Sequence, residues 1–275
     1  MSNLQFQEPA FTNVPLRLKS FYGRNIDQIP LLLSGKNEAG ETVDIKRVVI
    51  TPKQVLSDRI NGTNEIDMKL LRDNYVDTGA AVIVDPNGSG EAIIGLYSNP
   101  AVKELVHSLD SKTNLVKGSL QISNDQYQAI RKDAYVISAD AANSLRNDGY
   151  NENKVREGFW EYIAEGDAKL VKDTLKLVQD TKKGNFDNRM GLYLSSNEGL
   201  WLLCVGAVGD DNSSAFGYYS LNGSYGRLVG VAAEPLAREN LETKLGKTIT
   251  SALDARKPFE FNGTIYAPVQ GVALK

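Results

Sequence analysis

The sequence predicts an α+β protein, with mixed or antiparallel sheets built from β-hairpins and with amphipathic helices packed against them. Two observations carry this prediction. Several β-prone apolar runs are joined by short connections rich in Asn and Gly, which are typical of hairpins. Other segments combine a helix-capping residue with apolar residues at helical spacing. The chain has 275 residues, of which 41% are hydrophobic, so it can bury a core without disulfides or metals.

Residues 1–25 are expected to be extended, and a hairpin is expected to follow them. Pro9 and Pro15 exclude a helix over residues 1–25, and Leu16 and Leu18 alternate as in a strand. This arm either covers its own domain or adds to a neighbouring subunit. The runs IPLLLSG and TVDIKRVVI then indicate a hairpin, because the polar segment KNEAGE separates them.

Capping residues predict the next helices. Thr51-Pro52 with Gln54 starts one helix, and a second is expected over residues 64–77. AAVIVD and EAIIGLYS follow as two strands joined by PNGSG. Asn99-Pro100 then caps a further helix, AVKELVHSLD.

The middle of the chain contains short elements and then two longer helices. The short elements are, in chain order, SLQIS, a helical turn started by Ser123 with Gln126, AYVIS and ADAANSLRND. RNDGYNEN at 146–153 is the best candidate boundary. KVREGFWEYIAEG and AKLVKDTLKLVQDTKKG are helices separated at Gly166-Asp167. We therefore expect an arm (1–25) and two α+β domains (26–148 and 149–275), which alternatively form a single domain.

The last third is expected to be mostly strand. GLYLSS and WLLCVGAV are strands, and residues 216–221 and 224–231 form a hairpin around Asn222-Gly223. A helix is predicted over 235–256, and FEF and TIY form a second hairpin around Asn262-Gly263.

The composition limits the available chemistry. His107 is the only histidine and Cys204 the only cysteine, so zinc sites of the Cys/His-rich kind and internal disulfides are excluded. His107 is interpreted as a partly exposed helical residue and Cys204 as a buried, inert thiol. DPNGSG at 85–90 resembles part of a calcium loop, but Leu96 occupies the position of the bidentate Glu, so a structural turn is favoured. We expect no metal and no cofactor.

Charge and hydropathy bear on partners and location. The net charge is −3, which does not suggest a nucleic-acid partner. No apolar run reaches the length that spans a bilayer, and the first twenty residues lack the features of a signal peptide. We therefore expect a cytoplasmic protein that binds neither nucleic acid nor membranes.

The function remains open between three readings. The favoured one is a non-enzymatic structural, assembly or interaction subunit, whose partner is either another protein or a second copy of the chain. Its contacts would come from the arm and the 210–227 region, where tyrosines and arginine are typical of binding surfaces. The candidate residues there are Tyr218, Tyr219, Tyr225, Arg227, Asp210 and Asp211. The alternatives are a hydrolase or transferase that uses loop carboxylates, Lys or Tyr, and a small-molecule-binding module.

Overall fold

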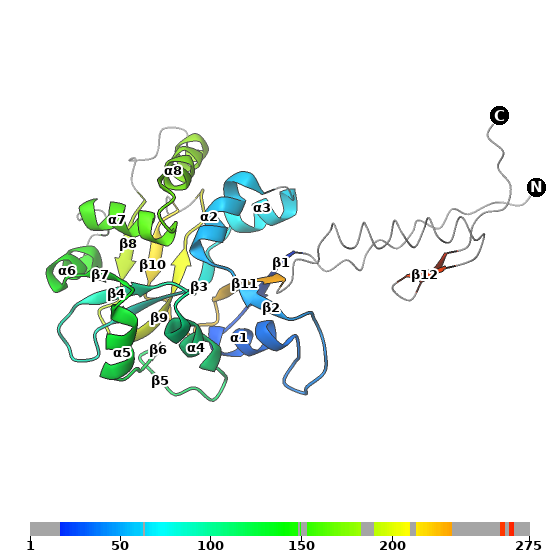
Figure 1. Cartoon of the computed structure of the whole chain (residues 1–275), viewed down its shortest axis with the longest axis horizontal. Coiled ribbons are helices and arrows are strands. Elements are labelled where there is room, and N and C mark those ends of the chain that lie inside the picture. The colour runs from blue at the N-terminus through cyan, green and yellow to red at the C-terminus, as the bar shows by residue number, and fades with distance from the viewer. Residues whose placement is uncertain are drawn as a thin grey trace, which may run out of the picture. The chain divides into compact units, whose positions relative to one another are not determined.

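The computed structural model describes residues 17–62, 64–147, 149, 153–182, 190–209, 213–232, 259–261 and 264–266, and every structural statement below concerns these residues. The chain divides into two units, residues 1–231 and 232–275. The first unit contains helices and an 11-stranded mixed sheet, so the predicted α+β class is confirmed (Figure 1). The described part of the second unit is an antiparallel pair of strands, β12 (Phe259–Phe261) and β13 (Thr264–Tyr266).

The helices and strands of the first unit alternate irregularly along the chain. The helices are α1 (Asn25–Ser34), α2 (Pro52–Asn61), α3 (Glu65–Arg72), α4 (Pro100–Ser108), α5 (Asn124–Arg131), α6 (Ala139–Asn147), α7 (Asn153–Ile163) and α8 (Ala168–Lys182). The strands are β1 (Leu18–Tyr22), β2 (Arg47–Val49), β3 (Val76–Val84), β4 (Ala92–Gly95), β5 (Leu115–Val116), β6 (Ser119–Leu120), β7 (Tyr135–Ile137), β8 (Leu192–Leu194), β9 (Gly199–Val205), β10 (Ala215–Gly217) and β11 (Arg227–Ala232).

The main path of the sheet runs β1-β11-β3-β9-β10-β8. The pairs β11–β3 and β10–β8 are parallel, whereas β3–β9, β3–β4 and β1–β11 are antiparallel. The register of β3 against β9 shifts between Asp77 and Ala81, which marks a β-bulge. This irregularity lies immediately after Asp77, at the end of β3 that borders the candidate site.

Strands β3 and β9 are buried along their whole length because helices cover both faces of the sheet. Side chains alternate between the faces, so Val82 packs in one core and Ile83 in the other. The first core also receives apolar residues from α2, α3, α6, α7 and α8, and the second from α1, α4 and α5 (Figure 1). The sheet is therefore the middle of three layers.

The predicted helix starts are confirmed in detail. Thr51 with Gln54, and Ser123 with Gln126, each form a reciprocal capping box. Asn99 accepts hydrogen bonds from two backbone N–H groups at the start of α4. The hairpin of β3 and β4 is confirmed, as is the pairing of β12 with β13.

The first predicted hairpin is wrong. The run that begins at Ile29 belongs to helix α1, although Pro30 lies inside it. Ile26, Ile29 and Leu32 recur at helical spacing and are all buried in the second core. Their burial outweighs the backbone hydrogen bond that proline cannot donate. Only residues 47–49 of the second run form a strand.

The hairpin predicted around Asn222-Gly223 is also wrong. Strand β10 pairs with β8 and β9, and β11 pairs with β1 and β3, so the two strands do not pair with each other. Residues 218–226 instead form a loop with two turns between them. Strand β11 pairs instead with β1 and β3, which come from the first third of the chain.

Other expectations fall partly outside the described residues. Of the arm, only residues 17–25 are described, and they contain β1 and the start of α1. The helix expected over 235–256 lies outside the described residues. Strands from both sides of residue 148 join one sheet, since β3 pairs with β9. Whether residues 26–148 and 149–275 form two domains stays a prediction.

Arg59 of α2 is a fully buried charged residue. Its guanidinium donates to the carbonyl of Leu71 at 2.8 Å, to that of Gly206 at 2.9 Å, and to the Ser213 hydroxyl at 2.6 Å. Burial lowers the pKa of Arg59 to about 9, so the side chain remains charged at neutral pH. Arg59 thereby joins α2, the end of α3 and the segment after β9.

We predict that Arg59→Met lowers the free energy of unfolding by about 3 kcal/mol, because it leaves three buried acceptors without their donor. Urea unfolding followed by circular dichroism measures this change. Arg24→Met is the control, since Arg24 makes an exposed ion pair with Asp27 at 2.6 Å and should lose less than about 1 kcal/mol. Equal, small losses at both positions would contradict the structural role of Arg59.

Candidate ligand-binding site

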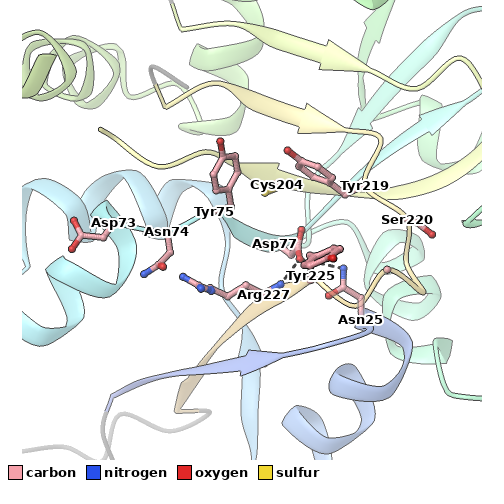
Figure 2. A pocket seen from close by; sticks show the side chains of 12 residues that line it. Asn25, Asp73, Asn74, Tyr75, Asp77, Cys204, Tyr219, Ser220, Tyr225 and Arg227 are labelled. Atoms are coloured by element: carbon pink, nitrogen blue, oxygen red, sulfur yellow. Dashed lines mark hydrogen bonds between the residues drawn. The ribbon is translucent and has the colours of Figure 1, made fainter. Parts of the chain in front are cut away.

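A cavity of about 460 Å³ lies where four segments of the first unit meet. Its walls come from the start of α1, from residues 73–77 between α3 and β3, from β9, and from the 219–227 segment (Figure 2). The lining residues are Asn25, Asp73, Asn74, Tyr75, Asp77, Cys204, Tyr219, Ser220, Gly223, Tyr225, Gly226 and Arg227. This volume is in the range of small-molecule sites.

Backbone hydrogen bonds hold the loop of residues 218–226 over the cavity. The N–H of Leu221 donates to the carbonyl of Gly118 at 2.9 Å, and the N–H of Ile26 donates to that of Leu221 at 3.3 Å. Near the other end, the N–H of Gly23 donates to the carbonyl of Gly226 at 3.0 Å. The loop is thus fixed at both ends, while its polar and aromatic side chains remain on the surface.

Asp77 is the buried ionisable group of the cavity, with 4% of its surface exposed. Its Oδ2 accepts hydrogen bonds from the backbone N–H of Arg227 at 2.8 Å and from Asn25 Nδ2 at 3.3 Å. Burial raises the pKa of Asp77 to about 6, although these hydrogen bonds and one from Cys204 act in the opposite direction. The carboxylate is therefore mostly ionised at neutral pH, in a poorly solvated place.

Asn25 is buried beside Asp77, with 1% of its surface exposed. Its Nδ2 faces the carboxylate, and its Oδ1 has no hydrogen-bond partner among the described residues. Gly226 approaches this oxygen so closely that a Cβ at position 226 would lie 2.6 Å from it. A side chain at this position would displace Asn25, so the glycine permits the close contact between loop and helix.

Arg227 contributes both its backbone and its side chain. The backbone N–H binds Asp77, whereas the side chain extends away from the carboxylate (Figure 2). The guanidinium carbon lies 4.0 Å from the centre of the Tyr22 ring, which is a cation–π contact. Nη1 is buried without a hydrogen-bond partner among the described residues, and burial lowers the pKa of Arg227.

Aromatic rings form another wall of the cavity. The rings of Tyr75 and Tyr219 are nearly perpendicular, at 89°, with their centres 6.4 Å apart. Phe216 lies behind them, 5.9 Å from Tyr75 and 5.6 Å from Tyr219. Such edge-to-face packing holds the two tyrosines in fixed positions.

Of the residues singled out from the sequence, Tyr219, Tyr225 and Arg227 line the cavity. Tyr218 is packed against Tyr219 at a ring distance of 4.8 Å, but it does not line the cavity. Asp210 and Asp211 lie outside the described residues. These positions were proposed from a hairpin that does not form, so only their side-chain chemistry supported them.

Sequence reasoning missed Asn25, Tyr75 and Asp77. A signal for Asp77 was present, because a single carboxylate in the apolar run that becomes β3 requires a buried partner. Asn25 gave no comparable signal. Its role depends on the contact between α1 and the loop before β11, which are about two hundred residues apart in the chain.

The two singular residues behave as expected. His107 is exposed on α4 and shares a hydrogen bond of 2.5 Å with the Tyr97 hydroxyl. Cys204 is buried on β9 opposite Asp77. Burial, reinforced by the neighbouring carboxylate, raises the pKa of Cys204 well above its usual value, so the thiol stays protonated. A protonated thiol is a poor nucleophile and a poor metal ligand.

The described residues offer neither a metal cluster nor a membrane-spanning helix. They contain no group of three or more His, Cys, Asp or Glu side chains placed to hold a metal ion. The described part of the chain also lacks a helix whose length and apolar character would let it cross a bilayer.

Comparisons with known proteins give a likeness in fold. No protein-family model matches the chain. No curated protein matches it in sequence. One solved structure aligns with this chain with a TM-score of 0.52 at 16% sequence identity. It comes from work on the accommodation of massive sequence variation in Nanoarchaeota by the C-type lectin fold. The alignment covers 80% of this chain and 99% of that one, so the chain is similar in fold to a C-type lectin.

We predict that Asp77 makes stability depend on pH. Its pKa is about 6 in the folded protein against an ordinary value of 3.8, so the folded state binds this proton more tightly. The resulting stabilisation of the folded state is fully present below pH ~4 and is lost as the pH rises through about 6. Over this range the free energy of unfolding falls by roughly 3 kcal/mol. Urea unfolding between pH 4 and 7 measures it.

Asp77→Asn should remove this contribution, so that the variant gains stability relative to the wild type as the pH rises. Glu38→Gln, at an exposed position, is the control and should follow the wild type. A difference between Asp77→Asn and the wild type that does not change with pH would contradict the prediction.

Proposed function

We propose that this protein is a non-catalytic binding module that takes a small ligand into the cavity beneath the loop of residues 218–226. The observation that carries this proposal is the buried polar pair of Asp77 and Asn25 at the base of an aromatic-walled cavity. Binding sites commonly combine apolar walls with a few polar groups that fix the ligand's orientation. The likeness to a C-type lectin fold adds support at the level of fold analogy alone.

The chemistry of the cavity favours binding over catalysis. The thiol of Cys204 stays protonated because its pKa is raised. Asp77 already accepts two hydrogen bonds at Oδ2 and lies opposite Cys204, with neither a lysine nor a histidine lining the cavity beside it. A hydrolase or transferase that uses loop carboxylates, Lys or Tyr is therefore our less favoured alternative.

A protein partner is the second candidate, and exposed tyrosines support it. Tyr22, Tyr218 and Tyr225 are 58%, 39% and 95% exposed, respectively. Tyrosine is enriched at the energetic centres of protein interfaces. A partner protein, or a second copy of this chain, would dock on this surface together with the arm of residues 1–25. We also propose that the protein is cytoplasmic and that it binds neither nucleic acid nor membranes.

We predict that Tyr219→Ala weakens binding of a cavity ligand at least about ten-fold, because it removes one of the two perpendicular walls. Ligand-detected NMR against a library of small polar metabolites identifies the ligand, and calorimetry measures its Kd. Tyr218→Ala is the matched control, since Tyr218 is the adjacent residue, is 39% exposed against 38% for Tyr219, and does not line the cavity.

The two candidates predict different results. A cavity ligand should retain its affinity for Tyr218→Ala to within about two-fold, whereas a docked protein should lose affinity for both variants. A library compound that binds the wild type and both variants equally would refute the cavity as its site. Circular dichroism of each variant confirms that the fold is kept.

A further inference from the structure

Three charged side chains line the cavity, Asp73, Asp77 and Arg227, and the last two are not paired with each other. Among the described residues, no salt bridge joins Asp77 or Arg227 to a side chain of opposite charge. Buried charges are normally paired, because a charge removed from water loses favourable solvation. The Tyr22 ring lies against the Arg227 guanidinium, and the hydrogen bonds that Asp77 accepts come from neutral donors. Within the described part of the chain, neither charged side chain has a counter-ion.

Hydrogen bonding is incomplete at the same two places. The Asn25 amide must point Nδ2 at Asp77, because the reverse orientation would bring two acceptor oxygens together. Among the residues that the structure describes, this leaves Asn25 Oδ1 as an acceptor without a donor, and Arg227 Nη1 as a donor without an acceptor. A buried polar atom without a partner is costly, so a ligand that supplies both partners gains affinity.

The aromatic wall suits a positively charged group. Tyr75 and Tyr219 meet at 89° on the same side of the cavity as Cys204 and Asp77 (Figure 2). Perpendicular tyrosines beside a carboxylate are the usual surroundings of an organic ammonium group. A neutral polyol would satisfy the free hydrogen-bonding atoms but would leave both charges without counter-ions.

We propose that the ligand is a small zwitterion of the α-amino-acid class, with its ammonium group against Asp77 and the tyrosines and its carboxylate on the Arg227 guanidinium. This inference rests on the proposed function and names the ligand class of the same cavity. Asn25 Oδ1 accepts from the ammonium group, and Arg227 Nη1 donates to the carboxylate. Both atoms are buried, and Gly226 lies close to Asn25 Oδ1, so we expect the turn at residues 223–226 to move when the ligand binds.

The test compares zwitterions with analogues that carry a single charge. The probes are L-leucine and L-phenylalanine, their amines 3-methylbutylamine and phenethylamine, and their acids 4-methylpentanoate and 3-phenylpropanoate. Calorimetry and ligand-detected NMR at pH 7.5 measure binding to the full chain. At least one amino acid should bind, and its amine and its acid should each bind at least about ten-fold more weakly. An amine or acid that binds as tightly as the amino acid overturns the proposal.

Charge-removing variants give an independent readout. Asp77→Asn and Arg227→Gln keep similar side-chain shapes, and each should weaken amino-acid binding at least about ten-fold. Arg24→Gln removes an exposed arginine outside the cavity lining and should leave the Kd unchanged. Amino-acid binding that persists in a folded Asp77→Asn and a folded Arg227→Gln overturns the proposal.

A neutral probe separates the failure of this inference from that of the proposed function. D-mannose carries no charge. One outcome is that D-mannose binds, Tyr219→Ala abolishes this binding, and no amino acid binds. The proposal of a zwitterionic ligand is then refuted, but the proposal of a binding module stands. If no amino acid, no D-mannose and no library compound shows Tyr219-dependent binding, both proposals are refuted.

Discussion

The burial of β3 on both faces is the constraint on which the rest of the structure depends. This strand pairs with β4, β9 and β11, and every one of its residues is buried. Helices must cover both faces of the sheet, because an exposed face would leave apolar side chains in water. The strand begins shortly after α3 ends, so Tyr75 from the connection and Asp77 from the start of β3 both line the cavity. The shift of register between Asp77 and Ala81 interrupts the regular ladder beside this polar side chain.

Local chemistry explains which parts of the fold could be predicted from the sequence. The capping boxes at Thr51 and Ser123 were recognised because a cap is satisfied within one helical turn. The hairpin around Asn222-Gly223 was predicted on equally local grounds, and it failed because β10 pairs with β8 and β9, whereas β11 pairs with β1 and β3. Helix α1 was missed because the apolar run that begins at Ile29 was interpreted as one strand of a hairpin, whereas burial of Ile29 and Leu32 decides the conformation. Tertiary burial outweighed local propensity in both cases.

The residues of the candidate site also divide into those that the sequence alone indicated and those that depend on contacts distant in sequence. Tyr219, Tyr225 and Arg227 were selected for residue type, which is readable from the sequence alone. The polar base of the cavity was not predictable in this way, because Asn25 and Asp77 acquire their roles only when α1, β3 and the loop before β11 come together. A carboxylate acquires a raised pKa from its surroundings, and those surroundings are non-local.

The cavity is assembled from segments near residues 25, 75, 204 and 220, so it exists only in the fully folded chain. Any occupant therefore binds the native state alone and shifts the folding equilibrium by mass action. At an occupant concentration a hundred times its Kd, this shift is about 2.7 kcal/mol, a sizeable share of the stability of an ordinary domain. Degradation of the transiently unfolded chain would slow accordingly, so that the protein's lifetime in a cell follows the abundance of the molecule it holds.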